Sequence, residues 1–379
     1  MSSKIIFLRT CTRPIPRVLR FMEISRRMGL EPEFWGAYRD KELGRDEVYE
    51  GEKVTRKGDF FPLVNGSQGK KYVKGVYNYC SAAVRDLKKI KRDVKVIHCS
   101  DVEPFMATVV FRLFSRAKVI YNIHDNLSQR YCQFPAWVNF ILNQIEGMCV
   151  VLSTVAVVPE EFRRAALPWW CRYNVKVAKN SPMSAIHVPG RKFDENSTLM
   201  ILYAGWLDEG RCIEQLIALA EAKPWIEIII AGDGDPSIHQ LVDEKVKVLP
   251  NLIYKGYVAN SEAIELTQQC DLVFANYKAN RVINIFAASN KIAEALCTGR
   301  PVIINQEIKI SKIIQQYDCG VVEAFGDIDG IINKLQRYRS EKGLYEQESK
   351  NARQLYDEQY SWEQVQQSIE VVINSCLRG

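Results

Sequence analysis

The stretch that decides the fold reads SNKIAEALCTGRPVII and covers residues 289–304. Ser289 is a plausible helix N-cap, and Gly299 is placed to end the short helix that follows. Lys291 and Glu294 are three residues apart, so they share one face at the start of that helix. A helix N-terminus favours an anion. The pattern therefore predicts a site for a ligand with phosphates at the cap and hydroxyls one turn further on, as in a nucleotide sugar.

Length and composition describe a globular chain. Its 379 residues predict two domains, because single domains hold roughly 100–200 residues. No apolar run reaches the ~18 residues that a membrane-spanning helix needs, and the N-terminus lacks the features of a signal peptide. The eleven cysteines are scattered without a C-x-x-C pair, which favours free cytosolic thiols over a disulfide framework. We therefore expect a cytoplasmic protein.

Charge is divided unevenly along the chain. Residues 1–182 hold 31 Lys and Arg against 18 Asp and Glu, whereas the remainder is acidic. The basic half, with the cluster Lys88, Lys89, Lys91 and Arg92, predicts docking on an anionic membrane surface at about 1 kcal/mol per residue. The alternative is a solvated helix end on a surface of uneven charge. We expect no nucleic acid among the partners.

Strands alternate with helices along the chain, which predicts an α/β protein with doubly wound parallel sheets. We expect an N-terminal domain at 1–182, a linker at 183–198, a second domain at 199–360 and a C-terminal helix at 361–379 that crosses back to the first domain. Residues 36–75 are polar and rich in glycine, so we expect a loop there with at most a short strand.

Two further glycine-marked loops follow predicted strands in the second half. Gly205 and Trp206 come before Arg211 in one loop, and Gly232 and Gly234 lie in the other. Because the carboxyl ends of parallel strands meet at one edge, these loops and residues 289–304 should converge there. Taken singly, each glycine has the alternative explanation of a tight turn.

His124 and Asp125 follow the strand predicted at residues 118–121. His124 is either a structural histidine or a polar group beside the reacting sugar, and Asp125 could orient it or cap the next helix. Asp233 and Asp235 have the spacing of a D-x-D metal motif but sit in a glycine turn. No other metal or cofactor motif is present, so we expect neither a metal nor a cofactor.

The second half resembles the C-terminal domain of family 4 retaining glycosyltransferases, which have the GT-B fold. The motifs that carry the resemblance are LYAGW, IAGDG, LIYKGYV and residues 289–304, in that order over residues 199–325. VIHCSD and VIYNIHD in the first half resemble the acceptor domain more loosely. The resemblance implies two Rossmann-like domains facing a central cleft, the second of which holds a nucleotide-diphosphate-sugar donor.

The resemblance also implies roles for single residues. Glu294 would bind the ribose hydroxyls, Lys291 and Arg211 would neutralise the diphosphate, and His124 would reach the donor sugar. Asn290 and the glycine loops would complete the donor site. In this family, retention of the anomeric configuration is ascribed to attack by the acceptor on the same face of the sugar from which the phosphate departs. The leaving phosphate itself takes the proton of the acceptor.

This sequence departs from the family pattern at four positions: Trp206 replaces the arginine of the usual Gly-Arg pair, Cys212 replaces a frequent glycine, and two further departures concern charged residues. Phe286 stands where the family often has a first glutamate, and Glu209 stands where it often has a donor lysine. The departures make Arg211 and Lys291 the expected phosphate contacts.

We therefore expect a glycosyltransferase that extends a polysaccharide precursor, such as a capsule or O-antigen repeat on a lipid-linked acceptor. It would be cytoplasmic or peripheral on the inner face of the cell membrane. A nucleotide-sugar 2-epimerase and a non-catalytic GT-B partner subunit are the alternatives.

Overall fold

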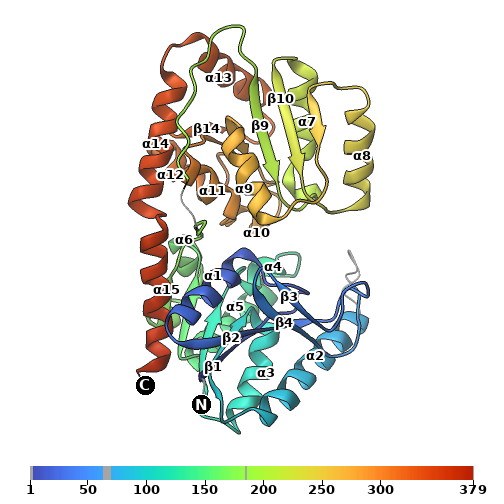
Figure 1. Cartoon of the computed structure of the whole chain (residues 1–379), viewed down its shortest axis with the longest axis vertical. Coiled ribbons are helices and arrows are strands. Elements are labelled where there is room, and N and C mark those ends of the chain that lie inside the picture. Colours follow the sequence, from blue (N-terminus) through green and yellow to red (C-terminus); the bar gives the residue numbers. More distant parts are fainter. Residues whose placement is uncertain (1–2, 63–69, 184–185, 379) are drawn as a thin grey trace. The chain divides into compact units, whose positions relative to one another are not determined.

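A computed structural model describes residues 3–62, 70–183 and 186–378. The chain forms two compact units. Unit 1 comprises Met1–Lys179 and Val365–Gly379, and unit 2 comprises Asn180–Gln364. Each unit is built around its own predominantly parallel sheet (Figure 1), which confirms the doubly wound α/β class predicted above.

The sheet of unit 1 has the strand order β3-β4-β2-β1-β5-β6-β7-β8, and every pair is parallel except β3 with β4. Its inner strands are buried on both faces, which explains their almost unbroken apolar sequences. The strands are β1 (Ser3–Leu8), β2 (Leu30–Ala37), β3 (Asp46–Tyr49), β4 (Glu52–Lys57), β5 (Val94–Ser100), β6 (Lys118–Asn122), β7 (Val155–Val158) and β8 (Val175–Val177).

Helices connect the strands of unit 1. They are α1 (Pro16–Arg27), α2 (Lys70–Lys89), α3 (Val102–Arg112), α4 (Leu127–Arg130), α5 (Ala136–Leu152), α6 (Glu161–Ala166) and the 3-10 helix η1 (Trp169–Asn174). Most of α15 (Trp362–Leu377) also belongs to this unit, where Arg27 of α1 donates a hydrogen bond to Gln366.

The prediction of a loop over residues 36–75 is wrong in part. β3 and β4 form a hairpin in which Val48 pairs with Lys53, and α2 begins at Lys70. Glu50 and Gly51 have φ angles of 49° and 77°, the left-handed conformation that a tight hairpin turn requires. The hairpin was missed because β3 is a polar edge strand without a strong alternation of apolar residues. Residues 63–69 lie outside the described part of the chain.

The sheet of unit 2 has the strand order β11-β10-β9-β12-β13-β14, and every pair is parallel. Its strands are β9 (Leu199–Ala204), β10 (Ile226–Ala231), β11 (Leu252–Tyr254), β12 (Leu272–Phe274), β13 (Val302–Asn305) and β14 (Gly320–Glu323). Its helices are η2 (Glu209–Arg211), α7 (Ile213–Ala222), α8 (Pro236–Val246), α9 (Asn260–Gln269), α10 (Val282–Ile285), α11 (Asn290–Thr298), α12 (Ser311–Gln316), α13 (Ile328–Ser340) and α14 (Leu344–Gln359).

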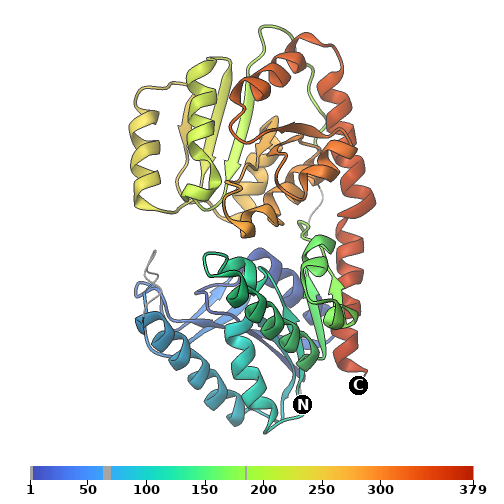
Figure 2. The ribbon, with the colours of Figure 1, turned by 180° about the vertical axis from the view of Figure 1, so that it is seen from behind.

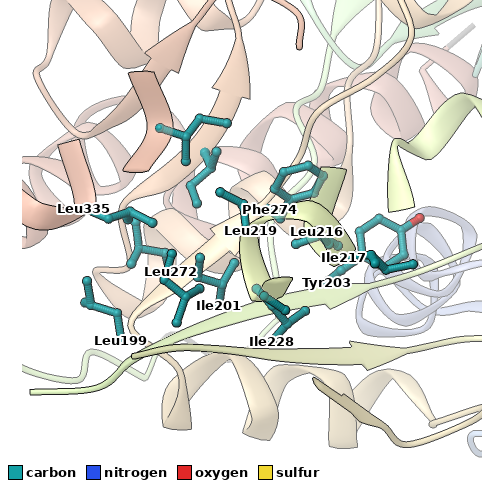
Figure 3. Close-up of a cluster of buried hydrophobic side chains, with 14 of the residues drawn as sticks. Leu199, Ile201, Tyr203, Leu216, Ile217, Leu219, Ile228, Leu272, Phe274 and Leu335 are labelled. Carbon is teal, nitrogen blue, oxygen red and sulfur yellow. The ribbon is translucent and has the colours of Figure 1, made fainter. Parts of the chain in front are cut away.

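The core of unit 2 lies between the sheet and its helices. Figure 3 shows Ile201 and Tyr203 of β9 near Leu219 and Leu216 of α7, with Leu199 at the other end of the strand, all of them buried. This packing fixes β9 at the centre of the sheet, so the loop after it is held on a rigid element.

The residues predicted as a linker lie in unit 2 and make hydrogen bonds there. The backbone N–H of Val188 donates to the carbonyl of Thr298, and the guanidinium of Arg191 lies 2.7 Å from the carboxylate of Asp271. Of this stretch, residues 184–185 lie outside the description.

Strand order reverses once in each unit. In unit 2 the chain runs from β9 outward to β11 and then returns to the other side of β9 as β12. In unit 1 the same reversal separates β1 from β5. Ligands of open α/β sheets bind at the carboxyl ends of the strands where the order reverses, so each unit has one preferred edge for a site.

Candidate functional site

Lys291 lies in the first turn of α11, and its amine lies over two tyrosine rings. Its Nζ atom is 3.7 Å from the ring centre of Tyr203 and 5.8 Å from that of Tyr277. Tyr203 is the next-to-last residue of β9, and Tyr277 follows the end of β12. The predicted phosphate-binding lysine therefore lies at the edge where strand order reverses in unit 2.

The surroundings of Lys291 disfavour the protonated, charged form of its amine. Burial lowers the pKa of its amine well below the ordinary lysine value, and the nearby Arg211 lowers this pKa further. Glu294 and Asp208 oppose the shift. An anionic ligand would act in the same direction as these carboxylates, so the site gains most from a ligand with more than one negative charge.

Arg211 completes the predicted pair of cations. It ends η2, and its guanidinium lies 5.0 Å from the ring centre of Tyr277. Its Nε atom is 3.4 Å from the carboxylate of Asp208, which also accepts a hydrogen bond from the backbone N–H of Gly210. Tyr277 thus contacts both cations, and cation–π contacts of this kind favour the charged forms.

The glycines after β9 and β10 have a packing role. A Cβ atom on Gly232 would lie 1.8 Å from the carbonyl oxygen of Gly205, and one on Gly234 would lie 1.9 Å from that of Leu207. Gly205 has a φ of 150°, and a Cβ atom added to it would lie 3.7 Å from the Nζ atom of Lys291. Close backbone approach explains Gly232 and Gly234, while Gly205 also borders the candidate site.

Other predicted donor residues lie at the same end of α11 or close to Tyr203. Ser289 occupies the predicted N-cap position, although its side chain makes no capping hydrogen bond. Asn290 is the first residue of α11, and Glu294 is buried one turn later, at 6% exposure. Trp206 is 48% exposed, and its carbonyl accepts a hydrogen bond from the Tyr203 hydroxyl at 2.5 Å.

Three residues of this edge were missed by sequence reasoning: Tyr203, Tyr277 and Lys278. The Lys278 amine lies 3.2 Å from the carboxylate of Glu209 and 3.1 Å from that of Glu214. Glu209, which stands where the family has a lysine, therefore forms an ion pair with a lysine from another loop. The position of Tyr277 and Lys278 directly after a buried strand was the available signal.

His124 lies at the corresponding edge of unit 1. Arg9 donates a hydrogen bond from Nη1 to His124 Nε2 at 3.3 Å, and the backbone N–H of His124 donates to Asp101 at 3.2 Å. Burial and the nearby Arg9 and Arg17 hold the pKa of His124 well below its usual value. The imidazole is therefore neutral, and since Arg9 donates to Nε2, its proton resides on Nδ1.

Asp125 does not orient His124. Its carboxylate instead forms an ion pair with Arg163 at 2.9 Å. The orienting contacts come from Arg9 and Asp101, two residues at the ends of β1 and β5.

The D-x-D spacing at Asp233 belongs to a turn that packs on α8. Asp233 lies 2.8 Å from the ring of His239, which also contacts the Tyr254 hydroxyl. In the described part of the chain, no three His, Cys, Asp or Glu side chains gather in a way that could hold a metal ion. Among the same residues, no helix is long and apolar enough to cross a membrane.

Part of unit 2 is similar to a known protein family. Residues 201–340 match the family model described as "Glycosyl transferases group 1". A search of curated protein sequences gave no match.

Similar solved structures cover the whole chain. Sucrose-phosphate synthase from Thermosynechococcus elongatus has a TM-score of 0.79 at 14% identity, with 99% of each chain covered. HepE from Anabaena, in complex with UDP and glucose, has a TM-score of 0.70 at 16% identity, covering 98% of this chain and 100% of HepE. The lipopolysaccharide outer core galactosyltransferase WaaB has a TM-score of 0.58 at 12% identity, covering 100% of this chain and 99% of WaaB. At these identities the likeness shows the fold, which is GT-B as the motifs predicted. With its group 1 domain at residues 201–340, the chain is a glycosyltransferase.

Proposed function

We propose that this glycosyltransferase is a retaining enzyme that moves a sugar from a nucleotide-diphosphate sugar to a glycan or a lipid-linked oligosaccharide. The observation that carries the donor assignment is that the cationic groups of Lys291 and Arg211 lie 5.8 Å and 5.0 Å, respectively, from the ring centre of Tyr277. Two cations beside one aromatic ring suit the two adjacent phosphates of such a donor. The complex of HepE with UDP and glucose makes UDP-glucose the first donor to test.

The proposed reaction breaks the bond between the sugar C1 atom and the β-phosphate oxygen. A hydroxyl oxygen of the acceptor forms the new bond to C1 on the same face, and its proton passes to the departing phosphate. Lys291 and Arg211 would stabilise the charge that grows on the diphosphate. Glu294 would bind the ribose hydroxyls, and Ser289, Asn290, Trp206 and the three glycine positions would line the donor site.

His124 is assigned to the sugar and acceptor. A neutral imidazole with its proton on Nδ1 can hydrogen-bond a hydroxyl group without attracting phosphate. This property supports a role distinct from that of the cations in unit 2.

We assign the enzyme to polysaccharide assembly of the capsule or O-antigen type. WaaB, named as a lipopolysaccharide galactosyltransferase, supports this class of acceptor. The excess of Lys and Arg over Asp and Glu in residues 1–182 supports peripheral association of unit 1 with an anionic membrane. Such a location would suit a lipid-linked acceptor.

The test is release of nucleotide diphosphate from a panel of nucleotide sugars, with and without glycan acceptors. We expect acceptor-dependent release with one donor, and NMR of the product should show the anomeric configuration of the donor. Activity that survives in the Lys291→Ala/Glu294→Ala variant would refute the site. An isomerised free sugar nucleotide would indicate an epimerase, and failure to bind any nucleotide diphosphate would indicate a non-catalytic subunit.

A further inference from the structure

Helix α5 exposes a row of large apolar side chains. Their spacing of three, four or seven residues places them on one face of the helix. They are Trp137, Phe140, Ile141, Ile145, Met148 and Leu152. Trp137 is 67% exposed and Phe140 is 65% exposed, although a surface helix ordinarily turns such residues inward. The inward face of α5 is occupied by Gly147, Cys149 and Val150.

The neighbouring helix extends this surface. Met106 and Val110 of α3 are exposed, as are Leu113 and Phe114 directly after it. The guanidinium of Arg112 donates a hydrogen bond to the carbonyl of Leu152, which joins the C-terminal ends of α3 and α5. We call these exposed residues of α3, α5 and positions 113–114 the α3–α5 face. Figure 2 shows α5 in green on the side of unit 1 that is turned toward the viewer.

The α5 part of the face carries no exposed charge. Between Tyr131 and Pro159 the only charged residue is Glu146, which is buried. Glu146 accepts hydrogen bonds from the backbone N–H of Leu127 at 2.9 Å and from the Tyr121 hydroxyl at 3.3 Å. Burial raises its pKa to about 8, so the carboxyl group is mostly protonated at neutral pH. An apolar patch of this extent normally marks a surface that is covered.

Basic side chains border the α3–α5 face at one end. The amine of Lys88 lies 3.7 Å from the ring centre of Phe114, and both residues are exposed. Arg112 and Arg116 are also exposed at the end of α3. The basic cluster at the C-terminal end of α2 therefore adjoins the apolar face, which the sequence alone did not reveal. We call Lys88, Arg112 and Arg116 the basic rim.

Charge decides between two possible occupants. A second copy of the chain, paired symmetrically through this face, would add a second basic rim to the interface, while α5 would supply no exposed acidic side chain to balance it. Acidic lipid headgroups would instead neutralise the rim while the acyl region receives the apolar side chains. Tryptophan and phenylalanine on an uncharged face, with lysine and arginine beside them, are the composition of helices that lie in a membrane interface.

We propose that the α3–α5 face inserts into the interface of an anionic lipid bilayer, with the basic rim over the acidic headgroups. This proposal deepens the membrane association proposed above and does not depend on the transfer reaction. It names the contacting helix and adds an apolar component to a prediction that rested on charge alone.

Co-sedimentation with vesicles tests the apolar component. The probes are vesicles of phosphatidylcholine alone and of phosphatidylcholine mixed with phosphatidylglycerol. We expect the full chain to bind the mixed vesicles and Trp137→Ser/Phe140→Ser to bind them at least about tenfold more weakly, because two large apolar side chains leave the bilayer. The matched control is Val248→Ser/Tyr257→Ser, which removes two side chains of unit 2 with exposures of 70% and 68%. This control should bind like the unmodified chain.

The electrostatic component is tested with Lys88→Gln/Arg116→Gln. We expect binding to mixed vesicles to weaken roughly fivefold per removed charge, and added salt to weaken binding of the unmodified chain. Thermal unfolding should be unchanged in every variant, since all the changed side chains are exposed.

Several outcomes would overturn the proposal. They are equal binding to both kinds of vesicle, no binding to either, or equal losses in the α5 variant and its control. A dimer of the unmodified chain that dissociates on Trp137→Ser/Phe140→Ser, without vesicle binding, would identify a second copy as the occupant. Nucleotide-diphosphate binding and sugar transfer, measured on the same samples, separate the two proposals. A chain that binds vesicles but neither binds nucleotide diphosphate nor transfers sugar would refute only the enzymatic proposal.

Discussion

The carboxyl edges of the two sheets share a topology and differ in their electrostatics. In unit 2 the edge between β9 and β12 gathers Lys291 and Arg211 around the ring of Tyr277. In unit 1 the edge between β1 and β5 joins Arg9 to a neutral His124 and to Asp101, whose carboxylate is 3.9 Å from the Arg9 guanidinium. The reversal of strand order supplies the position, and the side chains decide what binds there.

This difference divides the proposed work between the units. Two cations held close together repel each other and favour a ligand that brings at least two negative charges. A neutral imidazole, already hydrogen-bonded to an arginine, favours hydroxyl groups. We therefore propose that unit 2 recognises phosphate and that unit 1 recognises hydroxyl groups of the sugar or the acceptor.

The largest expected effect comes from removing the buried cation. Lys291→Ala should weaken nucleotide-diphosphate binding by about 1.5–3 kcal/mol, or roughly 10- to 100-fold, because a hydrogen-bonded charge is lost. Isothermal titration calorimetry measures this change. Lys312→Ala is the matched control, since Lys312 is an exposed lysine on α12 of the same unit. Near-normal affinity in Lys291→Ala would contradict the assignment.

The lowered pKa of Lys291 predicts that donor affinity depends on pH. Burial and Arg211 lower its pKa, so in the unliganded enzyme the amine loses its proton at a lower pH than an ordinary lysine. Donor affinity should therefore fall as the pH rises through that lowered value, because binding then requires uptake of a proton. In Lys291→Arg the guanidinium stays charged, and this decline should disappear from the titrations.

A smaller effect is expected at Arg211. Its charge is already partly balanced by Asp208, so Arg211→Ala should weaken binding of the nucleotide diphosphate roughly tenfold. Arg211→Lys should recover only part of the loss, because an ammonium group cannot contact two phosphate oxygens in the planar geometry of a guanidinium. Equal affinity of Arg211→Ala and the unmodified enzyme would assign the diphosphate to Lys291 and Lys278.

Much of the fold was readable from local patterns. The helix predicted within residues 289–304 is α11, and Gly299 ends it with φ of 75°. The alternation of strands and helices predicted both parallel sheets. α14 was missed because only a narrow stripe of it is apolar, through Tyr345, Ala352 and Leu355, while its other positions are largely polar.

The tyrosines of the site required information that a linear pattern does not contain. Tyr203 and Tyr277 are far apart in sequence and meet only because β12 returns to lie beside β9. Strand order therefore had to be known before either ring could be assigned to Lys291. The ion pair of Glu209 with Lys278 depends on the same return of the chain.

Replacing His124 should affect turnover and leave nucleotide binding unchanged. We expect His124→Ala to lower kcat by up to roughly tenfold, the equivalent of one hydrogen bond of ~1.4 kcal/mol. The dissociation constant of nucleotide diphosphate should not change, because its proposed contacts lie in unit 2. His187→Ala, which removes an exposed histidine, serves as the control in both measurements. A large loss of nucleotide affinity in His124→Ala would break the division between the two edges.

The smallest expected effect concerns divalent metal ions, and it follows from how unit 2 is charged. Lys291 and Arg211 lie where the diphosphate is proposed to bind, whereas the amine of Lys278 is paired with the carboxylates of Glu209 and Glu214. The two cations at the proposed diphosphate site can stabilise the leaving group without a metal ion. EDTA should therefore leave the rate of transfer unchanged. In Lys291→Ala, by contrast, one charge is missing, and added Mg²⁺ should restore part of the lost rate. Loss of activity in EDTA that Mg²⁺ restores in the unmodified enzyme would show that these side chains do not suffice, and would remove the contrast drawn between the two edges.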